Sequence, residues 1–278
     1  MTMFDLINQT HEKKIKRFVK QIEIANLAKV SQNLEKIIQQ IYDDIPLKKR
    51  ISYGRYSVIK KLGLFTYPFL DEKKIDIYRL ALYLFSEQKH DPFLRSLGMQ
   101  FLSLLAEKNN KNLNKVILLF EKAAIDESWE VRECSAGFIR KLIKAYPDQI
   151  HKWYLKMALA KNDKQRRFAI ESLRPVADNS WFKKKPDFAF SILKLLYKEP
   201  ATYPRTAVGN SLSDWMRIDE EKTLKIVKNL AKNGDKNSYW IAYRACRNLV
   251  KKKPILVMDL LKIDHYKYKD RSFSRQQG

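Results

Sequence analysis

The sequence contains few of the residues that interrupt or cross-link a chain. It has only 7 glycines and 9 prolines in 278 residues, and its apolar residues are mostly separated by charged residues at helical spacing. This pattern predicts an all-α chain. The two cysteines, Cys134 and Cys246, each lie among apolar residues of an expected helix. Buried, reduced thiols are therefore expected.

The sequence also lacks the motifs of nucleotide-dependent and metal-dependent catalysis. It contains no Gly-x4-Gly-Lys-Ser/Thr phosphate loop, no Gly-x-Gly-x-x-Gly and no Cys-x-x-Cys pair. The four histidines show no metal-ligand spacing; they are His11, His90, His151 and His265. We therefore expect no metal, no nucleotide and no other cofactor.

No apolar run approaches the length needed to span a membrane, and the first residues lack the basic flank and apolar core of a secretory leader. These absences predict a cytoplasmic protein without a membrane partner. The chain length of 278 residues is compatible both with one elongated domain and with two compact domains.

Positive charge is what the sequence has in excess. Lys+Arg number 55 against 31 for Asp+Glu, which leaves a formal net charge of +24. Such a surplus predicts a polyanionic partner, with nucleic acid as the leading candidate. Lysine that merely coats the surface is the alternative, and the arrangement of the arginines argues against it.

An internal repeat becomes readable from Asp71 onward. Aligning one position per repeat gives steps of 37, 34, 39 and 34 residues (132−95, 166−132, 205−166, 239−205), a period that suits a two-helix repeat. Starting at a position i that lies three residues after each aligned residue, small or mostly apolar residues recur at i, i+3, i+4, i+7 and i+8. The aligned residues are Arg95, Arg132, Arg166, Arg205 and Tyr239. This repeat predicts an α-solenoid of HEAT-like two-helix repeats with a concave basic face.

Three regions are expected along the chain. Residues 1–70 form an N-terminal helical cap region, residues 71–262 form the repeat array, and residues 263–278 form a basic, flexible tail without periodicity. A monomer is expected, as for other arrays of this kind.

A polar strip accompanies the repeat. Positions one, five and eight after the aligned residue share a helix face, because these spacings are close to whole turns. They are Glu133, Gly137 and Arg140, then Arg167, Glu171 and Arg174, then Thr206, Asn210 and Ser213, then Trp240, Arg244 and Arg247. Guanidinium groups along such a wall suit phosphate contacts. The candidate DNA-binding residues are Arg132, Arg140, Arg166, Arg167, Arg174, Arg205, Arg244 and Arg247.

The carboxylates in this strip allow two interpretations. Glu133 and Glu171 either form salt bridges with neighbouring arginines or stabilise positive charge that develops on a ligand. Asp214 lies one position beyond the strip and joins them. The candidate catalytic residues are therefore Asp214, Glu171 and Glu133.

Two tryptophans flank the strip. Trp129 precedes the helix of Glu133, and Trp181 follows the helix of Glu171. Each either packs as a core or cap residue or offers an aromatic face to a cationic base. With Asn210, they are the candidate lesion-contacting residues.

Three segments resemble the HEAT-like-repeat DNA alkylation repair family, the alkylpurine DNA glycosylases of the AlkC and AlkD types. They are Ser-Trp-Glu-Val-Arg-Glu at 128–133, Arg-Arg-Phe-Ala-Ile-Glu-Ser-Leu-Arg-Pro at 166–175 and Pro-Arg-Thr-Ala-Val-Gly-Asn-Ser-Leu-Ser-Asp at 204–214. The second is similar to the AlkC-type Arg-Arg-x-Ala-x-Glu-Gly-x-Arg-Pro stretch with its downstream Trp. The third is similar to Val-Arg-x-Ser-Val-x-Asn-x-Leu-Asn-Asp.

The resemblance implies that Glu171 and Asp214 match acidic positions that line the lesion site in the AlkC type. Trp129 and Glu133 resemble the Trp-x3-Asp of the AlkD type, with Glu in place of Asp. Arg166 or Arg167 is similar to the arginine that contacts the backbone near the lesion. Two other positions depart from the family pattern: Asn210 stands where the AlkD type has Trp, and Ser172 stands where the AlkC type often has Gly.

The resemblance therefore implies a nucleoid-associated, monofunctional alkylpurine DNA glycosylase whose partner is alkylated double-stranded DNA. Such an N-glycosyl hydrolase releases 3-methyladenine and 7-methylguanine and leaves an abasic site. Nearby carboxylates would stabilise the cationic sugar formed during cleavage. A catalytically inactive HEAT-repeat scaffold that binds damaged or branched DNA is the first alternative. A protein-binding solenoid is the second, and it predicts little salt dependence of DNA binding.

Overall fold

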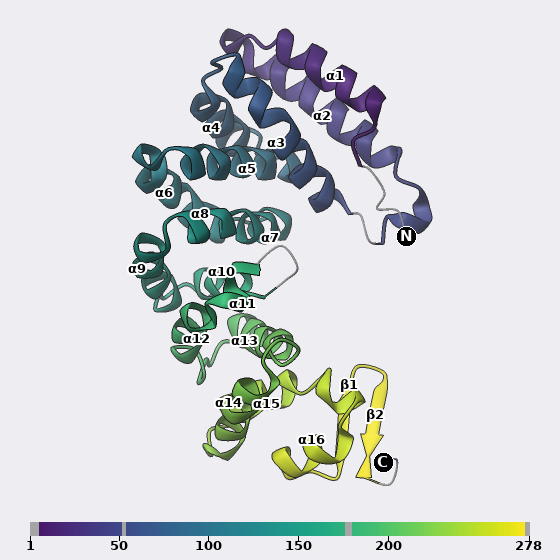
Figure 1. Cartoon of the computed structure of the whole chain (residues 1–278), viewed down its shortest axis with the longest axis vertical. Helices are drawn as coiled ribbons and strands as arrows, with labels where there is room; N and C mark the ends of the chain where they lie inside the picture. Colours follow the sequence, from purple (N-terminus) through teal and green to yellow (C-terminus); the bar gives the residue numbers. More distant parts are fainter. Residues whose placement is uncertain (1–5, 52–53, 176–179, 276–278) are drawn as a thin grey trace. The chain divides into compact units, whose positions relative to one another are not determined.

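The computed structural model describes residues 6–51, 54–175 and 180–275, and the regular structure in these ranges is almost entirely helical (Figure 1). The prediction of an all-α chain is confirmed. Contacts between residues divide the chain into two units, Met1–Ala145 and Tyr146–Gly278. None of the helices in the described ranges combines the length and apolarity that crossing a membrane requires.

The first unit consists of three mutually packed helices followed by helical hairpins. α1, α2 and α3 contact one another, α4 packs on α5, and α5 contacts α7. The start of α5 shows how the sequence sets a boundary, because the Asp91 side chain accepts hydrogen bonds from the N–H groups of Phe93 and Leu94 and Pro92 needs no partner there. The helices are α1 (Gln9–Lys20), α2 (Leu27–Asp43), α3 (Arg55–Glu72), α4 (Ile77–Glu87), α5 (Pro92–Lys108), α6 (Leu113–Ala124), α7 (Trp129–Phe138) and α8 (Arg140–Ala145), with 3-10 turns at Ile24–Asn26, Leu47–Lys49 and Asn110–Asn112.

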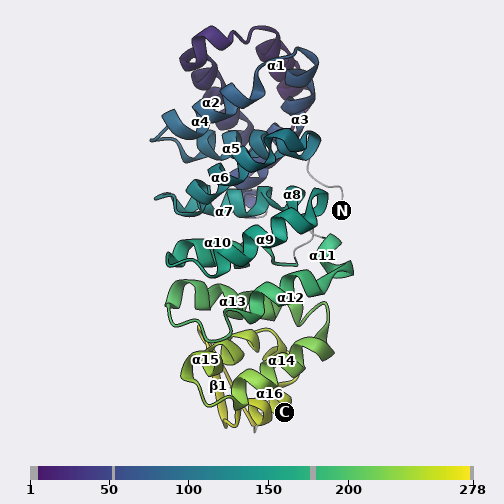
Figure 2. The ribbon, with the colours of Figure 1, turned by 90° about the vertical axis from the view of Figure 1, so that its left-hand side faces the viewer.

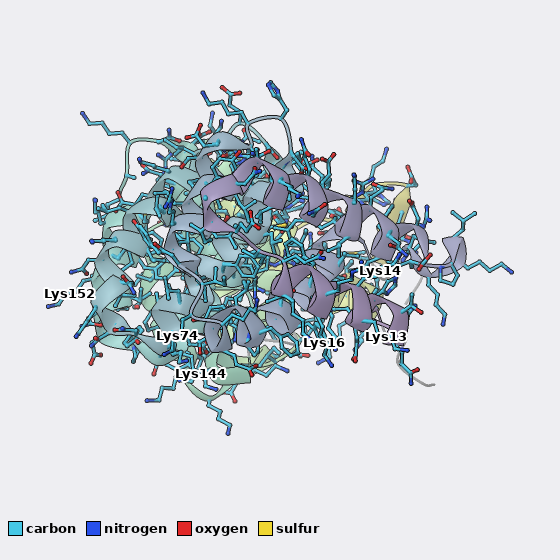
Figure 3. All side chains as sticks on the ribbon, turned by 90° about the horizontal axis from the view of Figure 1, so that it is seen from above. Lys13, Lys14, Lys16, Lys74, Lys144 and Lys152 are labelled. Atoms are coloured by element: carbon cyan, nitrogen blue, oxygen red, sulfur yellow. The ribbon has the colours of Figure 1, made fainter. Side chains whose placement is uncertain are left out.

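Helix α1 separates apolar from basic side chains. Ile15 is fully buried, whereas Lys13, Lys14 and Lys16 are exposed along its outer side (Figure 3). This amphipathic arrangement confirms that the basic N-terminal stretch is helical and places its cations in solvent. The expected boundary at residue 70 falls inside α3, so the functional division of residues 1–70 from the array stays a prediction.

The second unit contains a row of α10, α13 and α15, each in contact with the next, with α9, α12, α14 and α16 beside them (Figure 2). Pro147, Pro186 and Pro254 each begin a helix, as expected from their missing N–H. The elements are α9 (Pro147–Ala158), α10 (Asp163–Ser172), α11 (Ser180–Lys184), α12 (Pro186–Lys194), α13 (Thr202–Trp215), α14 (Glu220–Lys232), α15 (Lys236–Ala245), a 3-10 turn (Leu249–Lys251), α16 (Pro254–Leu261), β1 (His265–Tyr268) and β2 (Arg271–Ser274).

The apolar columns of the repeat form the core of this row. Ala169 in α10, Val208 and Leu212 in α13, and Ala242 and Ala245 in α15 have no exposed surface. Equivalent positions of successive repeats are therefore buried in the same way, which is the reason that the repeat period was readable in the sequence.

The last part of the chain differs from the expectation of an irregular tail. Residues 265–274 form a two-stranded antiparallel hairpin in which Tyr266 lies opposite Phe273. Tyr266 has no exposed surface and its ring stacks on Tyr243 of α15, with ring centroids 4.2 Å apart. The expectation was wrong for these residues because one aromatic side chain of this aperiodic segment, Tyr266, packs on the helix, and Phe273 contacts Tyr266 edge-on at 6.4 Å between ring centroids.

Both cysteines are buried free thiols, as expected. Burial raises the pKa of Cys134 to about 12 and the pKa of Cys246 to about 12. At pH 8 we expect iodoacetamide to modify the native thiols at least about 1000-fold more slowly than the unfolded ones, because the thiolate is the reactive form. Mass spectrometry with and without urea measures both rates. Rapid modification of either cysteine in the native protein would contradict this burial.

Candidate functional site

Two buried carboxylates and three arginines form a cluster in the second unit. Glu171 lies in the last turn of α10 and Asp214 in the last turn of α13, with 4% and 3% of their surfaces exposed. Arg174, just after α10, joins them. Its Nε and Nη2 donate to Asp214 Oδ2 at 2.7 and 2.6 Å, and its Nη1 donates to Glu171 Oε2 at 3.1 Å. One guanidinium therefore connects carboxylates of two successive repeats.

Two further arginines complete this set, which we call the Arg174 cluster (Arg167, Glu171, Arg174, Asp214, Arg217). Arg167 Nη2 lies 2.9 Å from Glu171 Oε1, and Arg217 Nη2 lies 2.8 Å from Asp214 Oδ1. Each of the four carboxylate oxygens thus has a guanidinium partner. Burial lowers the pKa of Arg174, but Glu171 and Asp214 outweigh this effect and the pKa is raised, so the bridging arginine stays charged.

Helical spacing accounts for the pairs within each helix. Arg167 and Glu171 are four residues apart, and Glu171 and Arg174, like Asp214 and Arg217, are three apart. Such pairs share a helix face. The Glu171 group on α10 and the Asp214 group on α13 come together only because α10 packs on α13. Arg217 was not among the predicted residues, although its i+3 spacing from Asp214 was visible in the sequence.

A second polar group lies one turn earlier on α13. Asn210 Oδ1 accepts a hydrogen bond from Arg244 Nε at 2.9 Å and another from Arg247 Nη1. Gly209 makes this crossing possible, because a Cβ there would lie 2.9 Å from Arg244 Cβ and 3.0 Å from its Cγ. Asn210, predicted to contact a lesion, thus positions two arginines, and its contact with a lesion stays a prediction.

The aligned arginine column has a structural function. The guanidinium groups of Arg132, Arg166 and Arg205 donate to backbone carbonyls of the turn that precedes their own helix. Arg166 also forms two hydrogen bonds with Glu199, at 2.8 and 2.9 Å, and Arg205 binds Asn237. The contacts of Arg166 and Arg205 connect consecutive repeats. Phosphate binding by these three arginines stays a prediction.

The acceptors of this column were missed, although the sequence contains a signal for them. Glu199 follows Arg166 by 33 residues, Asn237 follows Arg205 by 32, and Asp126 follows Arg95, to which it is also paired, by 31. Each offset is close to the repeat period. A carboxylate or amide about one repeat after an aligned arginine is therefore a usable sign of a structural pair.

The remaining predicted residues have separate surroundings. In the first unit, Trp129 begins α7 with 63% of its surface exposed, Glu133 is exposed on the same helix, and Arg140 begins α8. In the second unit, Trp181 contacts Phe182 and Phe188 edge-on, with ring centroids 5.3 and 5.5 Å away. These contacts support the packing interpretation of Trp181. The roles of Trp129, Glu133 and Arg140 stay predictions.

Comparison with known proteins supports the fold. AlkD2 from Streptococcus mutans superposes with a TM-score of 0.57 at 22% identity, over 77% of this chain and 97% of that chain. An alkylpurine DNA glycosylase AlkC from Pseudomonas fluorescens, bound to DNA containing an abasic site analogue, gives a TM-score of 0.54 at 16% identity, over 89% of this chain and 68% of that chain. The chain has the fold of the AlkC and AlkD proteins. This confirms the predicted class, an all-α solenoid of HEAT-like repeats.

No protein-family model and no curated protein sequence matches the chain. At the identities just given, the likeness to the two solved structures establishes the fold, and the activity has to be argued from the side chains of the site. The predicted concave basic face stays a prediction.

Proposed function

We propose that the protein binds alkylated double-stranded DNA and hydrolyses the N-glycosidic bond of cationic alkylpurines, releasing 3-methyladenine and 7-methylguanine and leaving an abasic site. The Arg174 cluster carries this proposal, because it places Glu171 and Asp214 together among arginines. The fold shared with an AlkC glycosylase bound to DNA supports the same activity.

The chemistry follows from the charge of the substrate. An N3- or N7-alkylated purine is already cationic, so it leaves as a neutral base when it takes the electron pair of the C1′–N bond. Positive charge then develops on the deoxyribose, where Glu171 and Asp214 stabilise it electrostatically. A water oxygen bonds to C1′ and releases its proton to solvent, so no lysine nucleophile is required.

The arginines of the cluster have a compatible function. Arg217 keeps 63% of its side chain exposed while it binds Asp214. A DNA phosphate that binds this guanidinium competes with the carboxylate for the same charge, which leaves Asp214 less neutralised and better able to stabilise a cationic sugar. The net charge of +24 favours encounter with DNA of any sequence.

A second candidate is a protein that binds damaged or branched DNA without releasing a base. The ion pairs themselves favour it, because every oxygen of Glu171 and Asp214 already has a guanidinium partner. In this interpretation the carboxylates only hold α10 against α13. The two candidates share DNA binding and differ in base release.

The deciding experiment is incubation of the purified protein with methylated duplex DNA, followed by chromatography of free bases. We expect release of 3-methyladenine and 7-methylguanine in proportion to protein and time, together with DNA affinity that falls steeply as salt rises. Tight binding without release above the protein-free background would leave the scaffold as the better function. Binding that does not change with salt would contradict both.

A further inference from the structure

The C-terminal hairpin is held firmly on α15. Besides the stacking of their rings, Tyr266 Oη donates to the Tyr243 carbonyl at 2.7 Å. Tyr243 Oη donates to the Lys267 carbonyl at 2.8 Å and accepts from the Lys267 N–H at 2.7 Å. The hairpin lies alongside α15 and α16, away from α14 of the same unit (Figure 1). It is therefore a preorganised surface of the second unit.

The hairpin adds a tyrosine to the arginine pair Arg244 and Arg247. Arg247 Nη1 donates to Tyr268 Oη at 3.4 Å, and the Arg244 guanidinium lies 5.8 Å from the centre of the Tyr268 ring. Within residues 6–51, 54–175 and 180–275, neither Arg244 nor Arg247 forms an ion pair with a carboxylate, in contrast to Arg167, Arg174 and Arg217. Their one shared acceptor is the neutral amide of Asn210.

Two guanidinium groups that share one neutral acceptor repel each other unless an anion joins them. Burial lowers the pKa of Arg244, and the nearby charges of Arg247 and Arg167 lower it further. Tyr268 accepts from Arg247, so its hydroxyl proton remains to be donated to a ligand. Two guanidinium groups and a hydroxyl donor together can donate hydrogen bonds to the oxygens of a phosphodiester.

The outer residues of the hairpin extend this positive region. Lys267, Lys269 and Arg271 are all exposed, against the single carboxylate of Asp270. Lys269 has a positive φ of 54° in the turn between the strands. Cations at the turn and on both strands present charge along the length of the hairpin rather than at one point.

We propose that the β1–β2 hairpin, with Arg244, Arg247 and Tyr268, binds the DNA backbone phosphates next to the nucleotide whose base is released. Asn210, which holds both arginines, precedes Asp214 by four residues on α13 and is therefore about one helical turn from it along the same helix. Neighbouring positions on one helix suit neighbouring groups of one DNA strand. The inference rests on the proposed function and adds the element that holds the strand.

The test compares two triple variants of the full-length protein that lose the same charge. One is Lys267→Gln/Lys269→Gln/Arg271→Gln in the hairpin. The control is Lys194→Gln/Lys228→Gln/Lys232→Gln, three exposed lysines of α12 and α14. The affinity for an alkylated duplex is measured by fluorescence anisotropy over a range of salt concentrations. We expect the hairpin triple to reduce the slope of log affinity against log salt by about 2–3, and the control to leave it unchanged.

A conservative variant tests the phosphate site itself. Tyr268→Phe keeps the ring and removes the hydroxyl, and we expect it to weaken duplex binding about 2- to 10-fold. The hairpin proposal would be overturned if the two triple variants had equal salt slopes and Tyr268→Phe bound the duplex as the wild type does. The glycosylase proposal would be unaffected by that result. Thermal stabilisation of the wild type by inorganic phosphate alone, with duplex binding independent of the hairpin, would also overturn the hairpin proposal. Absence of base release from the wild type would instead refute the glycosylase proposal.

Discussion

Asp214→Asn is expected to lower the rate of base release by about 100- to 1000-fold while DNA binding is retained. Asp214 is 3% exposed and accepts from Arg174 and Arg217. Asparagine keeps the shape of the side chain but removes the negative charge that stabilises the cationic sugar. Loss of one preorganised electrostatic group in a site shielded from water typically has an effect of this size. Single-turnover release of 3-methyladenine and 7-methylguanine measures it.

The control for Asp214→Asn is Asp187→Asn, which makes the same chemical change in a carboxylate that is 89% exposed and paired with Lys222. This variant is expected to release base at the wild-type rate. Melting temperature and duplex affinity of both variants separate loss of chemistry from loss of folding. If Asp214→Asn lowers only stability and the folded fraction releases base normally, the carboxylate is a structural ion-pair partner and the catalytic proposal fails.

Glu199→Gln is expected to lower the free energy of unfolding by about 3–5 kcal/mol, the usual cost of removing one partner of a buried salt bridge. The side chains of Glu199 and Arg166 are 2% and 14% exposed. The hydrogen bond with Glu199 is the largest cause that raises the pKa of Arg166. Because a guanidinium is protonated at neutral pH even without a carboxylate partner, Arg166 stays charged in the variant and loses its counter-ion. Glu199 also accepts from the Ala201 N–H at 2.9 Å. Urea denaturation measures the change.

Glu221→Gln is the matched control, because Glu221 pairs with Lys225 in a fully solvent-exposed position on α14. Its free energy of unfolding is expected to equal that of the wild type within error. Below the unfolding transition, Glu199→Gln is expected to keep the salt slope of DNA binding, since Arg166 fastens repeats together. Equal stability of the two variants would show that the Arg166–Glu199 pair does not hold the repeats together.

Much of the fold was predictable from the sequence because the repeat is strongly periodic. Equivalent positions of α10, α13 and α15 are buried in each helix, so their apolar columns were readable at a period close to that of a helical hairpin. The proximity of Arg167, Glu171 and Arg174 was predictable for a similar reason, because spacings of three and four residues place side chains on one helix face.

The sequence by itself determined the helices, their packed faces and the surplus of positive charge, because these depend on local spacing and composition. Only the tertiary structure decided which arginines pair with residues of the next repeat and which lie beside the hairpin. Arg166 pairs with Glu199, 33 residues later in the sequence, and Tyr268 contacts Arg247 from a hairpin outside the repeat. Ion pairs depend on the position of a charged group in space to within about an ångström, and such positions are set by the stacking of helices that no local pattern encodes.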